Sequence, residues 1–192
     1  FPAWGEFDLT KYGGMTPHRT GLELPMNASR GCPFKCTFCC RTLGDESRRR
    51  SVGSVVLEME RNIEEFGCGS IAFLDETFVV GKKWIGELMD TIKKRGINKK
   101  LIWSCAFRVG GNSAELMHQL REAGCFYIFF GFESASEETL ARIKKRTRIK
   151  DMINTVDWAR NAGIIPVGAF IIGLPGETEK EFKETFDFLH AL

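Results

Sequence analysis

Short apolar runs alternate along the chain with longer segments in which apolar residues recur every three or four positions. The apolar runs predict strands at residues 21–27, 70–76, 101–107, 125–133 and 164–173. Uninterrupted apolar runs, as opposed to alternating ones, are typical of strands that are covered on both faces. We therefore expect five buried strands.

Amphipathic segments between these runs predict the helices. In residues 52–66 the apolar side chains repeat at helical spacing, and Gly67 follows as a helix end. The sequence Thr-Glu-Lys-Glu at 178–181 is a capping box, a pattern that opens a helix. Other helices are predicted at residues 82–95, 113–123, 137–144 and 150–162.

Strand and helix alternate five times, which implies a parallel sheet with right-handed helical crossovers. A complete eight-unit barrel needs roughly 250 residues, whereas this chain has 192 residues. We therefore predict a single α/β domain, built as an open partial barrel or a doubly wound sheet.

Composition and charge narrow the functional class only slightly. Hydrophobic residues make up 43% of the chain and charged residues 27%, which is ordinary for a globular protein. The net charge of +2 gives no sign of a nucleic-acid or membrane-binding surface. No apolar run reaches the length of a membrane span, and no secretory leader opens the sequence. We expect a soluble cytoplasmic protein.

The cysteines point to a specific chemistry. Four of the seven lie in the stretch RGCPFKCTFCCR, at positions 32, 36, 39 and 40, in the loop after the first predicted strand. The other three, Cys68, Cys105 and Cys125, are flanked by apolar residues and are expected in the core, since free cysteine behaves as a small hydrophobe.

Two inorganic centres can use such a cluster of thiols. A structural zinc normally takes four ligands in two separated pairs, and no second pair is present. A [4Fe–4S] cluster is bound by thiolates, and ligation by Cys32, Cys36 and Cys39 would leave one iron open to a substrate or cofactor. Cys40 adjoins Cys39, so we expect it to be a bystander.

The stretch CPFKCTFC has the form Cys-x3-Cys-x-aromatic-Cys, and here the sequence resembles the radical S-adenosylmethionine (SAM) superfamily. The resemblance extends over nearly all of residues 21–192. It implies a partial barrel of about five to six parallel strands with outer helices. It also implies that Cys32, Cys36 and Cys39 hold a [4Fe–4S] cluster, and that SAM binds the fourth iron. In that family the reduced cluster cleaves SAM to a 5′-deoxyadenosyl radical, while the protein positions the cofactors.

The resemblance also assigns SAM contacts to residues at the carboxyl ends of the strands. Where the family usually has Gly-Gly-Glu to hold the SAM amino group, this chain has Asp75, Glu76 and Thr77. Carboxylate and hydroxyl oxygens are still suitable acceptors for an ammonium group. Arg108, after the third predicted strand, is similar to the basic residue that meets the SAM carboxylate.

Two further segments resemble the binding surface for the SAM nucleoside. In GFESAS, Glu133 and Ser134 correspond to acceptors for the ribose hydroxyls. In GAFIIGLPGE, Ile171 and Gly173 correspond to the backbone and apolar surface along the adenine, and Phe38 is expected nearby.

Simpler interpretations exist for several of these residues. Arg108 can be a surface arginine, and Asp75 and Glu76 can simply begin a loop. Glu133 follows the most apolar strand, where an unpartnered carboxylate would be costly. The basic run at 48–50 is typical of a solvated face, although its position also suits a substrate or a redox partner.

Within the superfamily, the opening residues together with SRGCPFKCTFC and FIIGLPGET look most like the cobalamin-binding members. That likeness implies that residues 1–20 are a linker and that residues 21–192 are the radical SAM core. The core is then expected to be truncated after its fifth strand–helix unit. Cobalamin is then expected only through a separate domain.

The resulting expectation is a radical SAM enzyme core that abstracts hydrogen from an unknown substrate, with methyl transfer as one outcome. It implies a small-molecule or peptide substrate and a reductant such as a flavodoxin or ferredoxin. The alternatives are an iron–sulfur electron carrier, a fragment that only binds cluster and SAM, and a structural zinc module.

Overall fold

The computed structural model describes residues 1–12, 21–78 and 81–192. Five parallel strands form one sheet in the order β1-β4-β5-β6-β7. These strands are β1 (Leu22–Met26), β4 (Cys68–Phe73), β5 (Ile102–Arg108), β6 (Cys125–Glu133) and β7 (Ile165–Phe170). The predicted α/β fold, a partial barrel of parallel strands with outer helices, is therefore confirmed.

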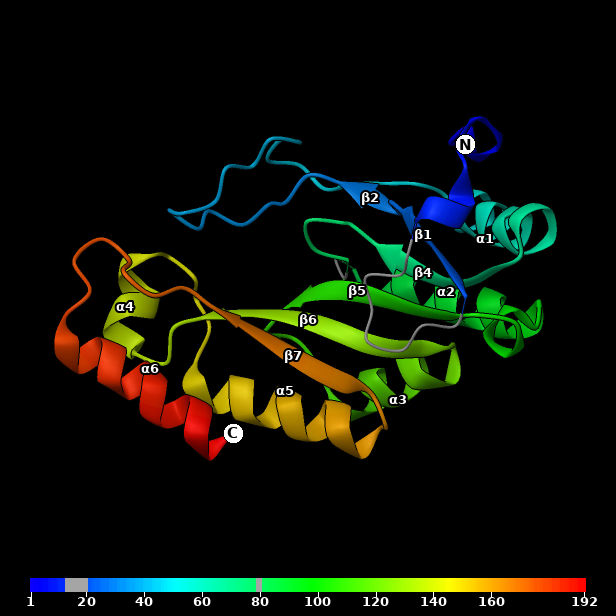
Figure 1. Ribbon diagram of the computed structural model, residues 1–192. Helices are drawn as coiled ribbons and strands as arrows, with labels where there is room; N and C mark the ends of the chain where they lie inside the picture. Colours follow the sequence, from blue (N-terminus) through cyan, green and yellow to red (C-terminus); the bar gives the residue numbers. More distant parts are fainter. Residues whose placement is uncertain (13–20, 79–80) are drawn as a thin grey trace.

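The helices cover one side of this sheet. They are α1 (Val52–Phe66), α2 (Lys82–Lys94), α3 (Ala114–Glu122), α4 (Glu137–Arg142), α5 (Ile149–Asn161) and α6 (Glu179–Ala191), with 3-10 turns η1 (Trp4–Glu6), η2 (Leu9–Lys11) and η3 (Ile97–Lys99). Figure 1 shows α3, α5 and α6 along one side of the sheet and the loop after β2 on the other. In the described part of the chain, no helix combines the length and hydrophobicity of a bilayer span.

A second, small sheet was not predicted from the sequence. Strands β2 (Ser29–Arg30) and β3 (Arg48–Arg49) pair antiparallel and flank the cysteine-containing loop at residues 31–47. Two-residue strands carry too few positions for a hydrophobic pattern, so periodicity does not detect them. This pair closes the base of the loop and fixes where it leaves the main sheet.

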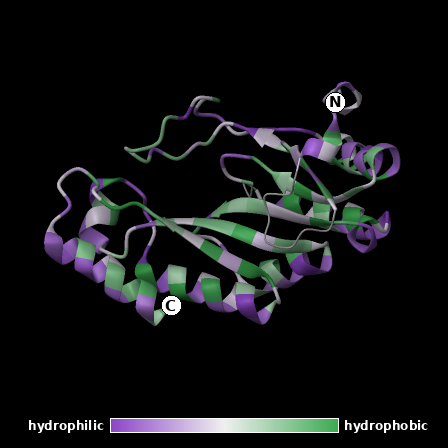
Figure 2. Ribbon diagram, viewed as in Figure 1, coloured by the Kyte–Doolittle hydropathy of each residue, from purple (hydrophilic) through white to green (hydrophobic). Residues whose placement is uncertain are grey.

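The core is largely aromatic and lies against the strands. Phe73, Phe78, Trp103 and Phe107 form successive ring contacts with centroids 4.6 to 6.3 Å apart. Figure 2 shows the strands as mostly hydrophobic and the helices as mixed. Cys68, Cys105 and Cys125 are buried, so their predicted core role is confirmed.

The helix boundaries confirm their sequence signals. Gly67 ends α1 in the left-handed conformation, with φ of 63°. The capping box at the start of α6 is complete, because the Thr178 hydroxyl accepts from the Glu181 amide and the Glu181 carboxylate accepts from the Thr178 amide.

Two predicted strands end earlier than expected. The strand predicted at 70–76 ends at Phe73, since the chain turns so that Asp75 reaches back toward Ser29. The strand predicted at 164–173 ends at Phe170, and Gly173 lies beyond it on the loop in the left-handed region, with a φ of 83°. The predicted site residues after these strands therefore lie on loops, at the carboxyl edge of the sheet.

Candidate functional site

The cysteine loop is shaped by contacts within the protein. The Cys32 amide donates to the Gly44 carbonyl at 3.1 Å, which joins the two ends of the loop. Gly31 has a φ of 84°, and a Cβ there would lie 2.2 Å from the Glu46 carbonyl oxygen, so only glycine fits. The Thr37 amide donates to the Ile143 carbonyl at 3.0 Å and ties the loop to the end of α4.

The four clustered cysteines differ in exposure. Cys36 is buried, Cys32 is partly buried, and Cys39 and Cys40 are exposed. Burial raises the pKa of the Cys32 thiol, a hydrogen bond with the Phe34 backbone acts in the opposite direction, and the neighbouring Cys39, Glu76 and Cys36 add to the increase. Cys36 and Cys39 therefore lie close enough to Cys32 to act on its thiol electrostatically.

This donor set fits an iron–sulfur cluster. Among the described residues, no three histidine, cysteine or acidic side chains converge as ligands of a single metal ion. A [4Fe–4S] cluster does not require such convergence, because each thiolate binds a different iron of the cubane. Cys32, Cys36 and Cys39 remain the residues predicted to hold it.

Arg108 lies against the cysteine loop. Its Nη1 is 3.2 Å from the Sγ of Cys36, and its guanidinium carbon lies 4.2 Å from the centre of the Phe34 ring. The guanidinium therefore donates to the sulfur of a predicted cluster ligand and stacks on a neighbouring ring of the same loop. The alternative of an unattached surface arginine does not describe this geometry, and the predicted contact with the SAM carboxylate stays a prediction.

Asp75 has a structural partner close to the loop. Its buried carboxylate accepts hydrogen bonds from the Ala28 amide at 3.0 Å and from the amide and hydroxyl of Ser29. Burial raises the pKa of Asp75, while these hydrogen bonds act in the opposite direction. Asp75 thus holds the segment that leads into β2, and its proposed contact with SAM is not needed to explain its burial.

Glu76 and Thr77 present unsatisfied polar atoms. The Oε2 of Glu76 and the Oγ1 of Thr77 are buried without a hydrogen-bond partner among the described residues. Buried polar atoms are normally paired, so these two atoms are available to accept a hydrogen bond from a bound group. Within the predicted Asp75–Thr77 segment, these two side chains are the better candidates for holding an ammonium group.

Glu133 is paired with a residue that sequence reasoning missed. The Lys145 ammonium lies 2.8 Å from Oε1 of Glu133, and both side chains are almost completely buried. Glu133 adopts a φ of 69° at an irregular step in the β6–β7 pairing. A Cβ on Gly131 would come within 2.9 Å of both charged groups, so this glycine makes room for the pair.

The remaining predicted SAM contacts divide into two groups. The Phe38 ring lies 5.9 Å from the Lys145 nitrogen, and the Ile171 amide donates to the Glu133 carbonyl at 2.9 Å. These residues therefore gather around the Glu133–Lys145 pair. Ser134 is instead fully buried, with its hydroxyl 3.1 Å from that of Thr185 on α6.

Gly173 lies on the loop between β7 and α6. Its amide donates to the Glu177 carboxylate at 2.6 Å. Glu177 therefore supports this loop and the approach to α6, while its Oε1 is buried without a partner among the described residues. The expected position of Gly173 along an adenine ring stays a prediction.

Comparison with known proteins identifies the family. Residues 26–189 match the radical SAM superfamily, and the chain belongs to it. An uncharacterised methyltransferase of Pyrococcus horikoshii is 36% identical over 85% of this chain and 36% of its own length. The anaerobic magnesium-protoporphyrin IX monomethyl ester cyclase of Cereibacter sphaeroides is 30% identical over 96% of this chain and 30% of its own.

A solved structure shows the same fold. The radical SAM methyltransferase TsrM from Kitasatospora setae, with cobalamin and a [4Fe–4S] cluster bound, superposes with a TM-score of 0.82 at 20% identity. The match covers 95% of this chain and 38% of that one. At this identity the likeness shows the fold, and the family match at residues 26–189 is what places the chain in the radical SAM superfamily. The chain spans about a third of the length of the relatives it matches.

Proposed function

We propose that this chain is the cluster- and SAM-binding core of a radical SAM enzyme that modifies a small molecule, with methyl transfer as the outcome. The carrying observation is the loop with Cys32, Cys36 and Cys39, placed at the carboxyl edge of a parallel sheet within a chain of this superfamily. The methyltransferase named among its relatives supports methylation.

The bound cluster would supply the single electron that cleaves SAM to methionine and a 5′-deoxyadenosyl radical. The residues of the chain have the other tasks. Glu76 and Thr77 would accept hydrogen bonds from the SAM ammonium through atoms that have no partner among the described residues. Phe38 and Ile171 would lie along the nucleoside, beside Glu133.

The buried Lys145 adds a second cation to the proposed site. Arg108 is already in contact with Cys36, whereas Lys145 lies between Glu133 and the Phe38 ring. SAM carries both a carboxylate and ribose hydroxyls, and the Glu133–Lys145 pair offers an acceptor and a donor together. Lys145 is therefore a candidate for the carboxylate, alongside Arg108.

The proposal extends to organisation and surroundings. Residues 1–20 would be a linker, of which positions 13–20 lie outside the described residues, and residues 21–192 would be the core. Cobalamin would be held by a further domain. The cysteines are unpaired thiols, which suits a cytoplasmic location. The proposed reductant is a flavodoxin or ferredoxin.

Anaerobic reconstitution tests the proposal. We expect the reduced protein to show the electron paramagnetic resonance (EPR) signal of a [4Fe–4S] cluster, to change that signal when SAM is added, and to form 5′-deoxyadenosine. Lys145→Gln and Glu133→Gln should weaken the SAM-induced change, whereas Lys150→Gln, at an exposed position on α5, should not. A cluster whose spectrum ignores SAM would instead indicate an electron carrier.

A further inference from the structure

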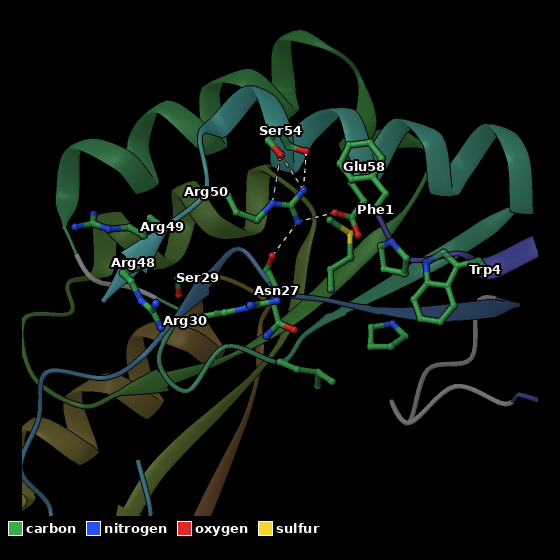
Figure 3. A pocket seen from close by; sticks show the side chains of 14 residues that line it. Phe1, Trp4, Asn27, Ser29, Arg30, Arg48, Arg49, Arg50, Ser54 and Glu58 are labelled. Atoms are coloured by element: carbon green, nitrogen blue, oxygen red, sulfur yellow. Dashed lines mark hydrogen bonds and ion pairs between the residues drawn. The ribbon is translucent and has the colours of Figure 1, made fainter. Parts of the chain in front are cut away.

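A cavity separate from the proposed SAM site lies at the β1 edge of the sheet, beside the base of the cysteine loop. Its volume is about 820 Å³, within the size range of small-molecule sites. We name it the arginine pocket, after the side chains that distinguish it. The lining includes Phe1, Trp4, Met26, Arg30, Arg48 and Arg49. Figure 3 shows Arg30, Arg48 and Arg49 on one side of the pocket and Phe1 and Trp4 on the other, with Arg50 between them.

One arginine of this pocket is neutralised. Arg50 forms an ion pair with the buried carboxylate of Glu58, and it donates to the backbone carbonyls of Asn27 at 2.9 Å and Ser54 at 3.0 Å. These contacts, drawn in Figure 3, hold the partly buried Arg50 against α1. Arg50 is therefore part of the pocket wall and not a free cation.

The other three arginines carry uncompensated charge. Arg30, Arg48 and Arg49 form no ion pair with a carboxylate in the described part of the chain, and all three are exposed. Arg48 donates to the Leu43 carbonyl at 2.9 Å, which leaves its charge unneutralised. The whole chain has a net charge of only +2, so this local excess is not a result of general basicity.

The fold holds the positive charges of Arg30 and Arg48 close together, and their repulsion lowers the stability of the strand pair. Arg30 and Arg48 are direct partners across the antiparallel β2–β3 pair, where Cβ atoms are about 4.5–5.5 Å apart and like charges destabilise the pairing. The pair is nevertheless fixed in place, because Asp75 holds Ser29 and Ser29 is the partner of Arg49. An anion bound between Arg30 and Arg48 would remove this repulsion.

The opposite wall indicates what else the ligand contains. Trp4 and Phe1 bring aromatic rings to this wall, with Arg50 against the Phe1 ring, and the almost fully buried Met26 lies behind them. The Nε1 donor of Trp4 is buried without an acceptor among the described residues. A ligand that combines an anionic group with an apolar or aromatic body would match both walls.

From this arrangement we infer that the arginine pocket binds a small molecule with a phosphoryl group and an apolar or aromatic body. A phosphoryl group fits better than a carboxylate, because it carries a charge of about −1.5 to −2 and three acceptor oxygens and can meet two guanidinium groups at once. The bound molecule would lie next to the segment at residues 29–32 that enters the cysteine loop. The inference does not depend on SAM cleavage.

Calorimetric titration with phenyl phosphate tests this inference. The full chain, reconstituted anaerobically, is titrated with saturating SAM present so that phenyl phosphate cannot enter the SAM site. We expect binding at least tenfold tighter than that of inorganic phosphate. Arg30→Gln/Arg48→Gln should weaken it at least tenfold, and Trp4→Ala should weaken phenyl phosphate but not inorganic phosphate.

Control measurements exclude three other causes of weaker binding: a general loss of positive charge, unfolding of the variant and failed reconstitution. Arg95→Gln/Arg160→Gln removes the same charge at two exposed positions away from the pocket and should leave binding unchanged. Without ligand, the Arg30→Gln/Arg48→Gln variant should melt no lower than the native chain, because it loses like-charge repulsion. The iron content of each sample separates a failed reconstitution from a failed inference.

Three results would overturn the inference. The first is equal binding of phenyl phosphate by the native and Arg30→Gln/Arg48→Gln proteins. The second is equal affinity for phenyl phosphate and inorganic phosphate, because the apolar wall would then play no part. The third is binding of polyglutamate without binding of phenyl phosphate, which would make the arginines a docking face for an acidic protein.

Discussion

Arg108 Nη1 lies 3.2 Å from Cys36 Sγ, although the two residues are 72 positions apart in the chain. The same guanidinium stacks over Phe34 at 4.2 Å. One side chain at the end of β5 therefore contacts two residues of the cysteine loop. It holds the loop against the sheet and places a fixed positive charge beside a predicted cluster ligand.

This contact predicts an effect on the reduction potential of the cluster. In the native chain, the hydrogen bond and the positive charge of Arg108 next to a thiolate both favour the reduced, more negative cluster. Arg108→Met removes both. We expect the potential to fall by on the order of 50 mV, since 59 mV corresponds to a tenfold change in a one-electron equilibrium. EPR-monitored redox titration measures it. Arg95→Met is the control, and an unchanged potential in Arg108→Met would show that the contact is only structural.

The ligand assignment predicts different outcomes for two nearby cysteines. Cys36 is buried in the loop and Cys40 is exposed beside Cys39. Cys36→Ala should abolish cluster binding, whereas Cys40→Ala should retain it. Iron and sulfide analysis of the reconstituted variants decides the point, and equal loss in both would contradict the assignment.

The contacts of Asp75 predict a stability effect independent of any cofactor. Asp75→Asn replaces an acceptor oxygen by a donor opposite the Ala28 and Ser29 amides. Hydrogen bonds to a charged group contribute about 1.5–3 kcal/mol each, so we expect the free energy of unfolding to fall by about 2 kcal/mol or more. Urea denaturation measures the loss. Asp90→Asn, whose side chain is 80% exposed, should change it by less than about 0.5 kcal/mol.

Glu181 predicts a pH dependence in the acid range. Its pKa is lowered to about 2, mainly by the Thr178 amide and further by the Thr178 hydroxyl and Arg142. Because the pKa is lowered in the folded state, the ionised Glu181 carboxylate stabilises the folded chain. This contribution is complete above the ordinary pKa of 4.5 and is lost as the pH falls toward 2.

Thermal melting of Glu181→Gln tests whether this stabilisation is lost as the pH falls. The melting temperature of the variant should lie below that of the native chain at pH 7, and the difference should shrink between pH 5 and pH 3. Glu184→Gln, on the same helix, should show a small and constant difference. A gap for Glu181→Gln that stays constant with pH would show that the carboxylate charge is unimportant.

The sequence was sufficient for the sheet and the cysteine loop because both depend on local pattern. Apolar runs and glycine stops located all five strands of the main sheet, and the thiol spacing located the loop. What the pattern could not reveal depends on contacts between distant residues. Asp75 is held by Ser29, 46 residues away, and Ser134 by Thr185, 51 residues away.

Lys145 illustrates the same limit. It lies in the run RIKKRTRIK, where every basic residue has the same appearance as part of a solvated surface. Only the turn after α4 brings this particular lysine to Glu133, which itself occupies a left-handed position at the end of β6. A buried carboxylate after the most apolar strand was the available signal, since such a group requires a partner.

The backbone bonds that close the cysteine loop have a consequence for repair after exposure to oxygen. Backbone hydrogen bonds hold Cys32 to Gly44 and Thr37 to Ile143, and neither hydrogen bond involves iron. We therefore expect a chain that has lost its cluster to air to keep this loop closed, and to accept fresh iron and sulfide under reducing conditions without first refolding.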